Sequence, residues 1–132
     1  MNKEAHKKGI LESLTVLAEA IAKGVVERQR TIGFHCSAAL ADLLELYLHE
    51  QNLIDPGATI KHDFFTSERR ALEKLPQEFP HKKKLIALLR EVESRRNLLC
   101  YGKRQPEQKI DEYLALFNEG KALLASMGVS YE

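Results

Sequence analysis

The residues whose types and spacing favour chemistry lie in one segment late in the chain, residues 93–103 (ESRRNLLCYGK). On a helix with about 100° per residue, Arg96 lies only about 36° from the centre of an apolar stripe. The members of that stripe are Leu85, Leu88, Leu89, Val92 and Leu99. Because a lone buried charge is very unfavourable, we expect Arg96 either to be paired or to reach a cleft.

Two interpretations of Arg96 are left by the sequence. In the first, the arginine is structural: it snorkels near a helix end, or Asp42, Glu45 or Glu93 neutralises it. In the second, its planar guanidinium binds an anion, because the fork of N–H donors suits phosphate. The sequence favours neither interpretation over the other.

No metal-binding pattern connects the five histidines, which are His6, His35, His49, His62 and His81. None is three or four residues from another, the spacing that lets two imidazoles on one helix bind one ion. The chain also lacks the glycine-rich motifs of dinucleotide and P-loop sites and the G-x-S-x-G motif of hydrolases. We therefore expect no metal and no cofactor.

Composition and charge narrow the class of protein. Lys and Arg number 20 and Asp and Glu 19, so a strongly basic nucleic-acid binder is not indicated, although a local basic patch is compatible with these totals. The cysteines Cys36 and Cys100 lie far apart in apolar segments, which predicts reduced, buried thiols. No apolar run approaches the roughly 20 residues of a membrane span, and no signal peptide is recognisable. We expect a cytoplasmic protein.

The elements that must position Arg96 are helices, since apolar residues recur every three or four positions along most of the chain. The pattern predicts helices at residues 3–28, 31–52, 66–75, 81–101 and 106–127. Thr31 is the expected N-cap of the second helix, Thr66 or Ser67 that of the short third helix, and Gly102 the stop of the fourth. The fold class is therefore all-α, an antiparallel four-helix bundle with one additional short helix, in a single domain of residues 1–132.

Residues 5–127 resemble a HEPN domain (higher eukaryotes and prokaryotes nucleotide-binding). The resemblance rests on a long second helix rich in Ala and Leu and on the run Arg96-Asn97-Leu98-Leu99-Cys100-Tyr101 in the late helix. HEPN proteins carry an arginine, often followed by asparagine, then a short spacer and a histidine. This chain has the arginine, the asparagine and the spacing, but Tyr101 stands where the histidine is expected.

The resemblance implies a helical bundle that forms a homodimer along its late helices. Many members of the family are metal-independent ribonucleases of toxin–antitoxin or antiviral systems; others pair with small nucleotidyltransferases or only bind nucleotides and partners. Its implied site consists of Arg96, Asn97 and Tyr101 at the reacting centre and of Arg95, Arg96, Asn97 and Lys103 for nucleotide or RNA binding. We expect Asn97 to orient Arg96, Tyr101 to flank it, and Glu93 and Arg95 to supply supporting pairs.

Spacing on the helix adds a reason for a dimer. Residues five apart point about 140° apart, so we expect Arg96 and Tyr101 not to face one substrate from the same helix. A two-fold axis would bring two copies of the pair into a shared cleft, with Leu98 as a contact between the subunits.

Tyrosine in place of histidine weakens the prediction of catalysis. RNA cleavage needs a base for the 2′-hydroxyl and an acid for the leaving oxygen, and tyrosine is almost fully protonated at neutral pH. The sequence therefore predicts a dimeric HEPN-like module that binds a nucleotide, RNA or a protein partner, such as a nucleotidyltransferase or an antitoxin, without nuclease activity. One alternative is a metal-independent endoribonuclease in which His62 or His35 lies near Arg96; another is an unrelated helical-bundle interaction protein.

Overall fold

The computed structural model describes residues 3–131, and all regular structure in that range is helical. The helices are α1 (Lys3–Lys23), α2 (Gln29–Glu50), α3 (Glu68–Lys74), α4 (Lys82–Tyr101) and α5 (Glu107–Ser126), with a 3-10 turn η1 (His62–Phe65) before α3. The expected all-α class is confirmed. Residues 1, 2 and 132, which the single-domain prediction also includes, lie outside the described range.

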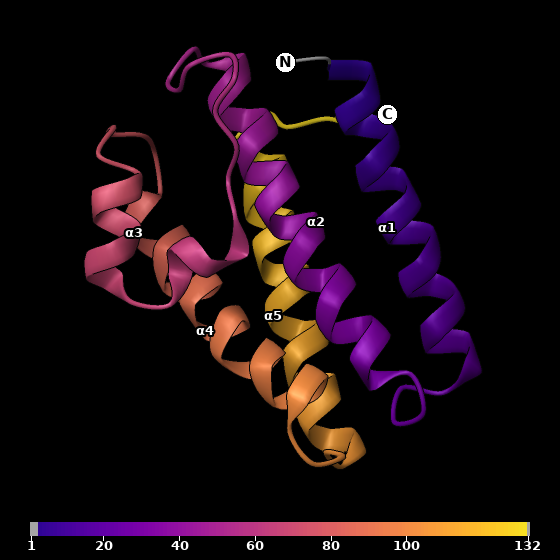
Figure 1. Cartoon of the computed structure of the whole chain (residues 1–132). Helices are drawn as coiled ribbons and strands as arrows, with labels where there is room; N and C mark the ends of the chain where they lie inside the picture. Colours follow the sequence, from indigo (N-terminus) through magenta and orange to yellow (C-terminus); the bar gives the residue numbers. More distant parts are fainter. Residues whose placement is uncertain (1–2, 132) are drawn as a thin grey trace.

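The four long helices lie lengthwise against one another, and each runs in the opposite direction to the preceding long helix (Figure 1). Helix α2 is central, because it contacts α1 on one side and α4 and α5 on the other. Its fully buried residues include Ile32, Leu40, Leu43, Leu44, Leu46 and Leu48. A helix that is apolar on several sides needs several covering neighbours, which explains this central position.

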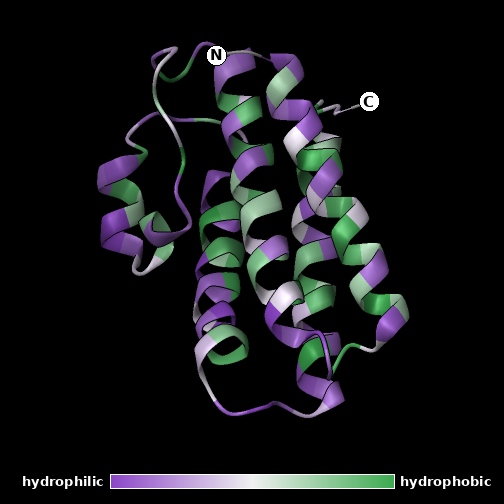
Figure 2. Ribbon diagram, turned by 45° about the vertical axis from the view of Figure 1, so that its right-hand side comes forward, coloured by the Kyte–Doolittle hydropathy of each residue, from purple (hydrophilic) through white to green (hydrophobic). Residues whose placement is uncertain are grey.

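Figure 2 shows hydrophobic and hydrophilic residues interspersed along each of the long helices. The apolar residues of α4 and α5 form one core with those of α2, and η1 and α3 close its side with Phe65 and Ala71. No helix in residues 3–131 has the length and apolar character that crossing a membrane requires.

Two helix boundaries predicted from the sequence are wrong at the connection between α1 and α2. Helix α1 ends at Lys23 rather than near residue 28, because Gly24 takes a φ of +133° that a helix cannot contain. Helix α2 then begins at Gln29 with Arg28 as N-cap, so Thr31 lies inside the helix and caps nothing. Gln29 fixes this connection, since its side chain accepts from the Gln105 N–H at 2.8 Å and donates to the Gln105 carbonyl at 3.2 Å.

Other boundary predictions are confirmed. The Ser67 side chain accepts a hydrogen bond from the Arg70 N–H at 3.1 Å and caps α3. Gly102 follows the last residue of α4, although its backbone is extended rather than left-handed. Both cysteines are buried and free.

Candidate functional site

Arg96 lies on the core-facing side of α4 and is only 8% exposed. No carboxylate within residues 3–131 forms an ion pair with it, so the predicted neutralisation by Asp42, Glu45 or Glu93 does not occur. Its guanidinium carbon instead lies 4.9 Å from the ring centre of Phe34 and 5.9 Å from that of Tyr101. One guanidinium nitrogen donates a long hydrogen bond to Asn97 Oδ1 at 3.4 Å. Aromatic ring faces, rather than an anion, therefore stabilise this charge.

Helix α2 contributes the other half of the site. Arg30 places its guanidinium carbon 5.5 Å from the same Phe34 ring, and the Phe34 and Tyr101 rings meet edge to face at 5.9 Å. We call Arg30, Phe34, Arg96 and Tyr101 the aromatic–arginine cluster. Tyr101 is 67% exposed, so the cluster opens to solvent at this residue.

The cluster brings Arg96 and Tyr101 together, although their spacing on the helix predicted that they would face apart. The Arg96 side chain is long enough to bring its guanidinium to the Tyr101 ring, with Phe34 beside both. Sequence reasoning missed Arg30 and Phe34. Their four-residue spacing on α2 was a usable signal, since such a pair shares one helix face.

A close approach of α2 and α4 brings the two halves together. A Cβ on Gly33 would lie 2.7 Å from Cys100 Sγ and 3.1 Å from Leu99 Cβ, so only glycine fits there. The buried Tyr113 hydroxyl donates to the Gly33 carbonyl at 2.8 Å and ties α5 to the same point. Burial raises the pKa of the Cys100 thiol, while the positive charges of Arg96 and Arg30 oppose the rise. The thiol is therefore a neutral packing group.

Glu93 pairs with a histidine instead of with Arg96, contrary to expectation. Its two carboxylate oxygens lie 3.0 and 2.9 Å from His62 Nδ1, which η1 presents to α4. The carboxylate side chain is 6% exposed and the imidazole 42%. Two histidines were considered as replacements for the motif histidine. One of them, His62, contacts Glu93, which lies one helical turn before Arg96 on α4. His35 instead lies 3.5 Å from the Ser13 hydroxyl of α1.

The remaining predicted residues divide into two groups. Arg95 is engaged elsewhere: it donates to Glu112 at 2.9 Å and to Glu91 at 3.2 Å, so it does not join the aromatic–arginine cluster. The hydrogen bond from Arg95 lowers the pKa of the Glu112 carboxyl. Asn97, near the C-terminal end of α4, and Lys103, just after that helix, are exposed, and Asn97 also accepts the long hydrogen bond from Arg96.

Positive charge gathers at the end of the bundle that carries the cluster. Residues 23–30 and 95–109 together hold eight Lys or Arg and two Glu, a net charge of +6 in a chain whose formal net charge is +1. The two segments meet in space, because Arg104 donates to the Val26 carbonyl at 2.6 Å and Gln105 bonds Gln29. In Figure 1 this end lies at the bottom. We call it the basic end.

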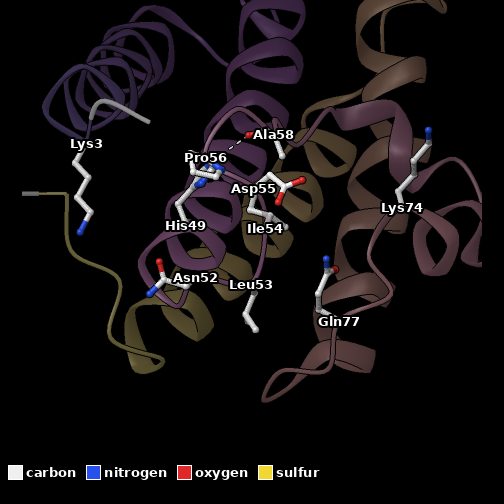
Figure 3. A pocket seen from close by; sticks show the side chains of 10 residues that line it. All are labelled: Lys3, His49, Asn52, Leu53, Ile54, Asp55, Pro56, Ala58, Lys74 and Gln77. Atoms are coloured by element: carbon white, nitrogen blue, oxygen red, sulfur yellow. Dashed lines mark hydrogen bonds between the residues drawn. The ribbon is translucent and has the colours of Figure 1, made fainter.

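A hollow with a volume of about 590 Å³ lies at the opposite end of α2 (Figure 3). It lies between the segment after α2 and the region around Lys74 and Gln77. Its side chains point in different directions, and it is lined by none of the predicted site residues Arg95, Arg96, Asn97, Tyr101 and Lys103. The residues of this hollow therefore do not converge on a ligand as the aromatic–arginine cluster does.

No metal site accompanies the cluster: nowhere in residues 3–131 do three or more His, Cys, Asp or Glu side chains gather in an arrangement suited to an ion. Comparison of the chain with protein-family models, with curated proteins and with solved structures gave no match.

Proposed function

We propose that the chain is a cytoplasmic, HEPN-like homodimer of antiparallel four-helix subunits that binds a phosphate-bearing ligand, a nucleotide or RNA, at the aromatic–arginine cluster. The observation that carries the proposal is the buried Arg96 guanidinium without a carboxylate partner among residues 3–131. Taking a guanidinium out of water without an anion is unfavourable, and ring faces return only part of that free energy. An anionic ligand would supply the rest.

The chemistry around Arg96 supports a nucleotide or RNA over a simple anion. Exposed aromatic rings beside arginines are a common platform for unstacked bases, with the cations directed at the phosphates. Tyr101 offers such a ring, and Arg30 and Arg96 lie against the Phe34 ring next to it. The basic end adds a field that attracts polyanions.

The homodimer is part of the proposal because an apolar side chain protrudes beside the cluster. Leu98 is 51% exposed on the face of α4 that turns away from the core. A two-fold contact through Leu98 would bring two clusters together along their late helices. Sedimentation of the wild type and of Leu98→Asp tests this part, and a monomeric wild type at micromolar concentration would remove it.

Binding of a short, single-stranded RNA with hydroxyl ends tests the ligand. We expect fluorescence anisotropy to show binding that weakens with salt, and Arg96→Ala to reduce the affinity by about tenfold to a hundredfold. The matched control is Arg69→Ala, which removes an exposed arginine paired only with Glu73 on α3 and should leave the affinity unchanged. If neither this RNA nor ATP binds, or if both variants behave alike, the proposed function is wrong.

A second candidate, metal-independent RNA cleavage, is favoured by the His62–Glu93 contact. A carboxylate that orients an imidazole is a common arrangement for acid–base catalysis, and this one lies one turn from Arg96. Incubation of RNA with the protein and a chelator distinguishes binding from cleavage. Cleavage that disappears in both His62→Gln and Arg96→Ala would establish the second candidate, and intact RNA at high protein concentration would reject it.

A further inference from the structure

Glu93 and Arg96 are opposite charges on one face of α4, yet they do not pair. They are three residues apart on a regular helix, so their side chains are neighbours. Both residues are buried, at 5% and 8% exposure. The usual outcome for two such groups is an ion pair, because each then compensates the other's loss of hydration. Something must keep them apart.

His62 provides the reason. Its Nδ1 lies within hydrogen-bond distance of both oxygens of the Glu93 carboxylate, and no other partner for that carboxylate is present among residues 3–131. When the imidazole is protonated, its charge balances that of Glu93. The guanidinium is then left to the rings of Phe34 and Tyr101 and remains available to an anion.

We propose that His62 is a positioning residue: by holding the Glu93 carboxylate, it leaves Arg96 able to bind an anionic ligand. This inference rests on the proposed function, since it concerns the affinity of the same site. When His62 loses its proton, the Glu93 charge is no longer balanced. The carboxylate then attracts Arg96 and repels an incoming phosphate, so the affinity falls.

The other charged groups around the pair already compensate one another. On the side of η1 and α3, Asp63 faces Arg70 at 3.8 Å, and Glu68 faces Arg90 at 3.7 Å. The Cys100 thiol and the Tyr113 hydroxyl feel the Glu93 charge, but burial raises the pKa of both, so both stay neutral. Imidazole is the side chain whose charge ordinarily changes between about pH 5 and 8. His62 is therefore the group in this surrounding from which a pH dependence would come.

The direction of the dependence follows from the charges. A proton on the imidazole balances the Glu93 charge, and the anion then binds tightly. Without that proton the site holds an unbalanced negative charge, and the anion binds more weakly. We expect the affinity to fall by about threefold to tenfold, the effect of one charge at a partly buried site.

The experiment measures RNA affinity at about pH 5.5 and pH 8. The probe is the short, hydroxyl-ended RNA, because phosphodiesters do not titrate in this range, whereas a terminal phosphate does. Two variants should remove the pH dependence, one by fixing the affinity at its low value and the other by fixing it at its high value. His62→Gln keeps a hydrogen-bond donor without the charge, so it should bind weakly at both pH values. Glu93→Gln removes the negative charge, so it should bind tightly at both.

The matched control is His81→Asn, which removes an exposed histidine at the start of α4. Its left-handed backbone, with a φ of 62°, suits asparagine, so the variant should fold and keep the wild-type pH dependence. If His62→Gln retains the wild-type pH dependence, or if the wild type has none, His62 is not a positioning residue. The proposed function survives either result, provided that Arg96→Ala still reduces the affinity by about tenfold or more.

Discussion

Each half of helix α2 adjoins one buried charge, Glu45 or Arg96, and the two charges have opposite kinds of partners. In the C-terminal half, the Glu45 carboxylate accepts from the Ile60 N–H at 2.7 Å and faces His6 at 3.4 Å and His49 at 4.0 Å. In the N-terminal half, Phe34 faces Arg96, which has two rings and one long bond to Asn97. The first charge has several polar partners in its own chain, whereas the second has none of opposite sign among residues 3–131.

We interpret this difference as that between a structural role for Glu45 and the proposed binding role for Arg96. Glu45 connects three segments of the fold, because His6 belongs to α1 and Ile60 to the connection before η1. Its polar partners already satisfy the carboxylate, and little remains for a ligand. Arg96 forms no ion pair within residues 3–131, so its guanidinium keeps its capacity for one. If this comparison is correct, removal of Glu45 lowers stability and removal of Arg96 lowers binding.

The largest effect is expected for Glu45→Ala. The substitution leaves the Ile60 N–H without its acceptor and removes the carboxylate that faces His6, so the free energy of unfolding should fall by about 2–4 kcal/mol. Urea denaturation measures the change. Glu19→Ala, an exposed position on α1, is the control and should change stability by less than about 0.5 kcal/mol. Equal effects of the two substitutions would show that Glu45 has no structural role.

The helices could be predicted from the sequence because they depend on the spacing of apolar residues and on capping residues within each segment. Apolar periodicity located all five, and Ser67 and Gly102 marked two boundaries correctly. The connection between α1 and α2 was not predictable in the same way. Its geometry depends on hydrogen bonds between Gln29 and Gln105, which are 76 residues apart, and no local signal reports such a pair.

The candidate site was predictable only in part, for a related reason. The position of Arg96 on the apolar stripe followed from helix geometry, and the structure places it in the core as expected. Its neighbours did not follow, because Phe34 and Arg30 come from another helix and His62 comes from η1. The choice of His62 rather than Arg96 as the partner of Glu93 depends on tertiary packing alone.

A smaller effect on stability is expected for Arg96→Met. A long apolar side chain fills the same space against Phe34 without the cost of a desolvated charge, so the free energy of unfolding should change by less than about 1 kcal/mol. RNA binding by the same sample should weaken as much as in Arg96→Ala. A decrease in stability of more than about 2 kcal/mol would show that the guanidinium holds the fold together, and the contrast with Glu45 would then disappear.

The smallest effect on stability is expected for Asp42, which lies near Glu45 on α2 but whose carboxylate is not stabilised as that of Glu45 is. Burial raises the pKa of the Asp42 carboxyl, the positive charge of His6 opposes the rise, and the negative charge of Glu45 adds to it. A raised pKa in the folded state means that the ionised carboxylate is less favourable there than in the unfolded chain. Asp42→Asn should therefore raise the free energy of unfolding at pH 7 by a few tenths of a kcal/mol, since solvent screens part of the effect.

The pH dependence of that gain provides its own control. The stability that a group of raised pKa contributes is present below its unfolded pKa, about 3.9 for aspartate, and is lost as the pH rises through its folded pKa. The difference between Asp42→Asn and the wild type in urea denaturation should therefore be present at pH 7 and vanish near pH 3.5, where both side chains are neutral. Asp111→Asn, at an exposed position on α5, should give no gain at either pH. A gain in stability of Asp42→Asn that persists near pH 3.5 would show that the charge of Asp42 is not its cause.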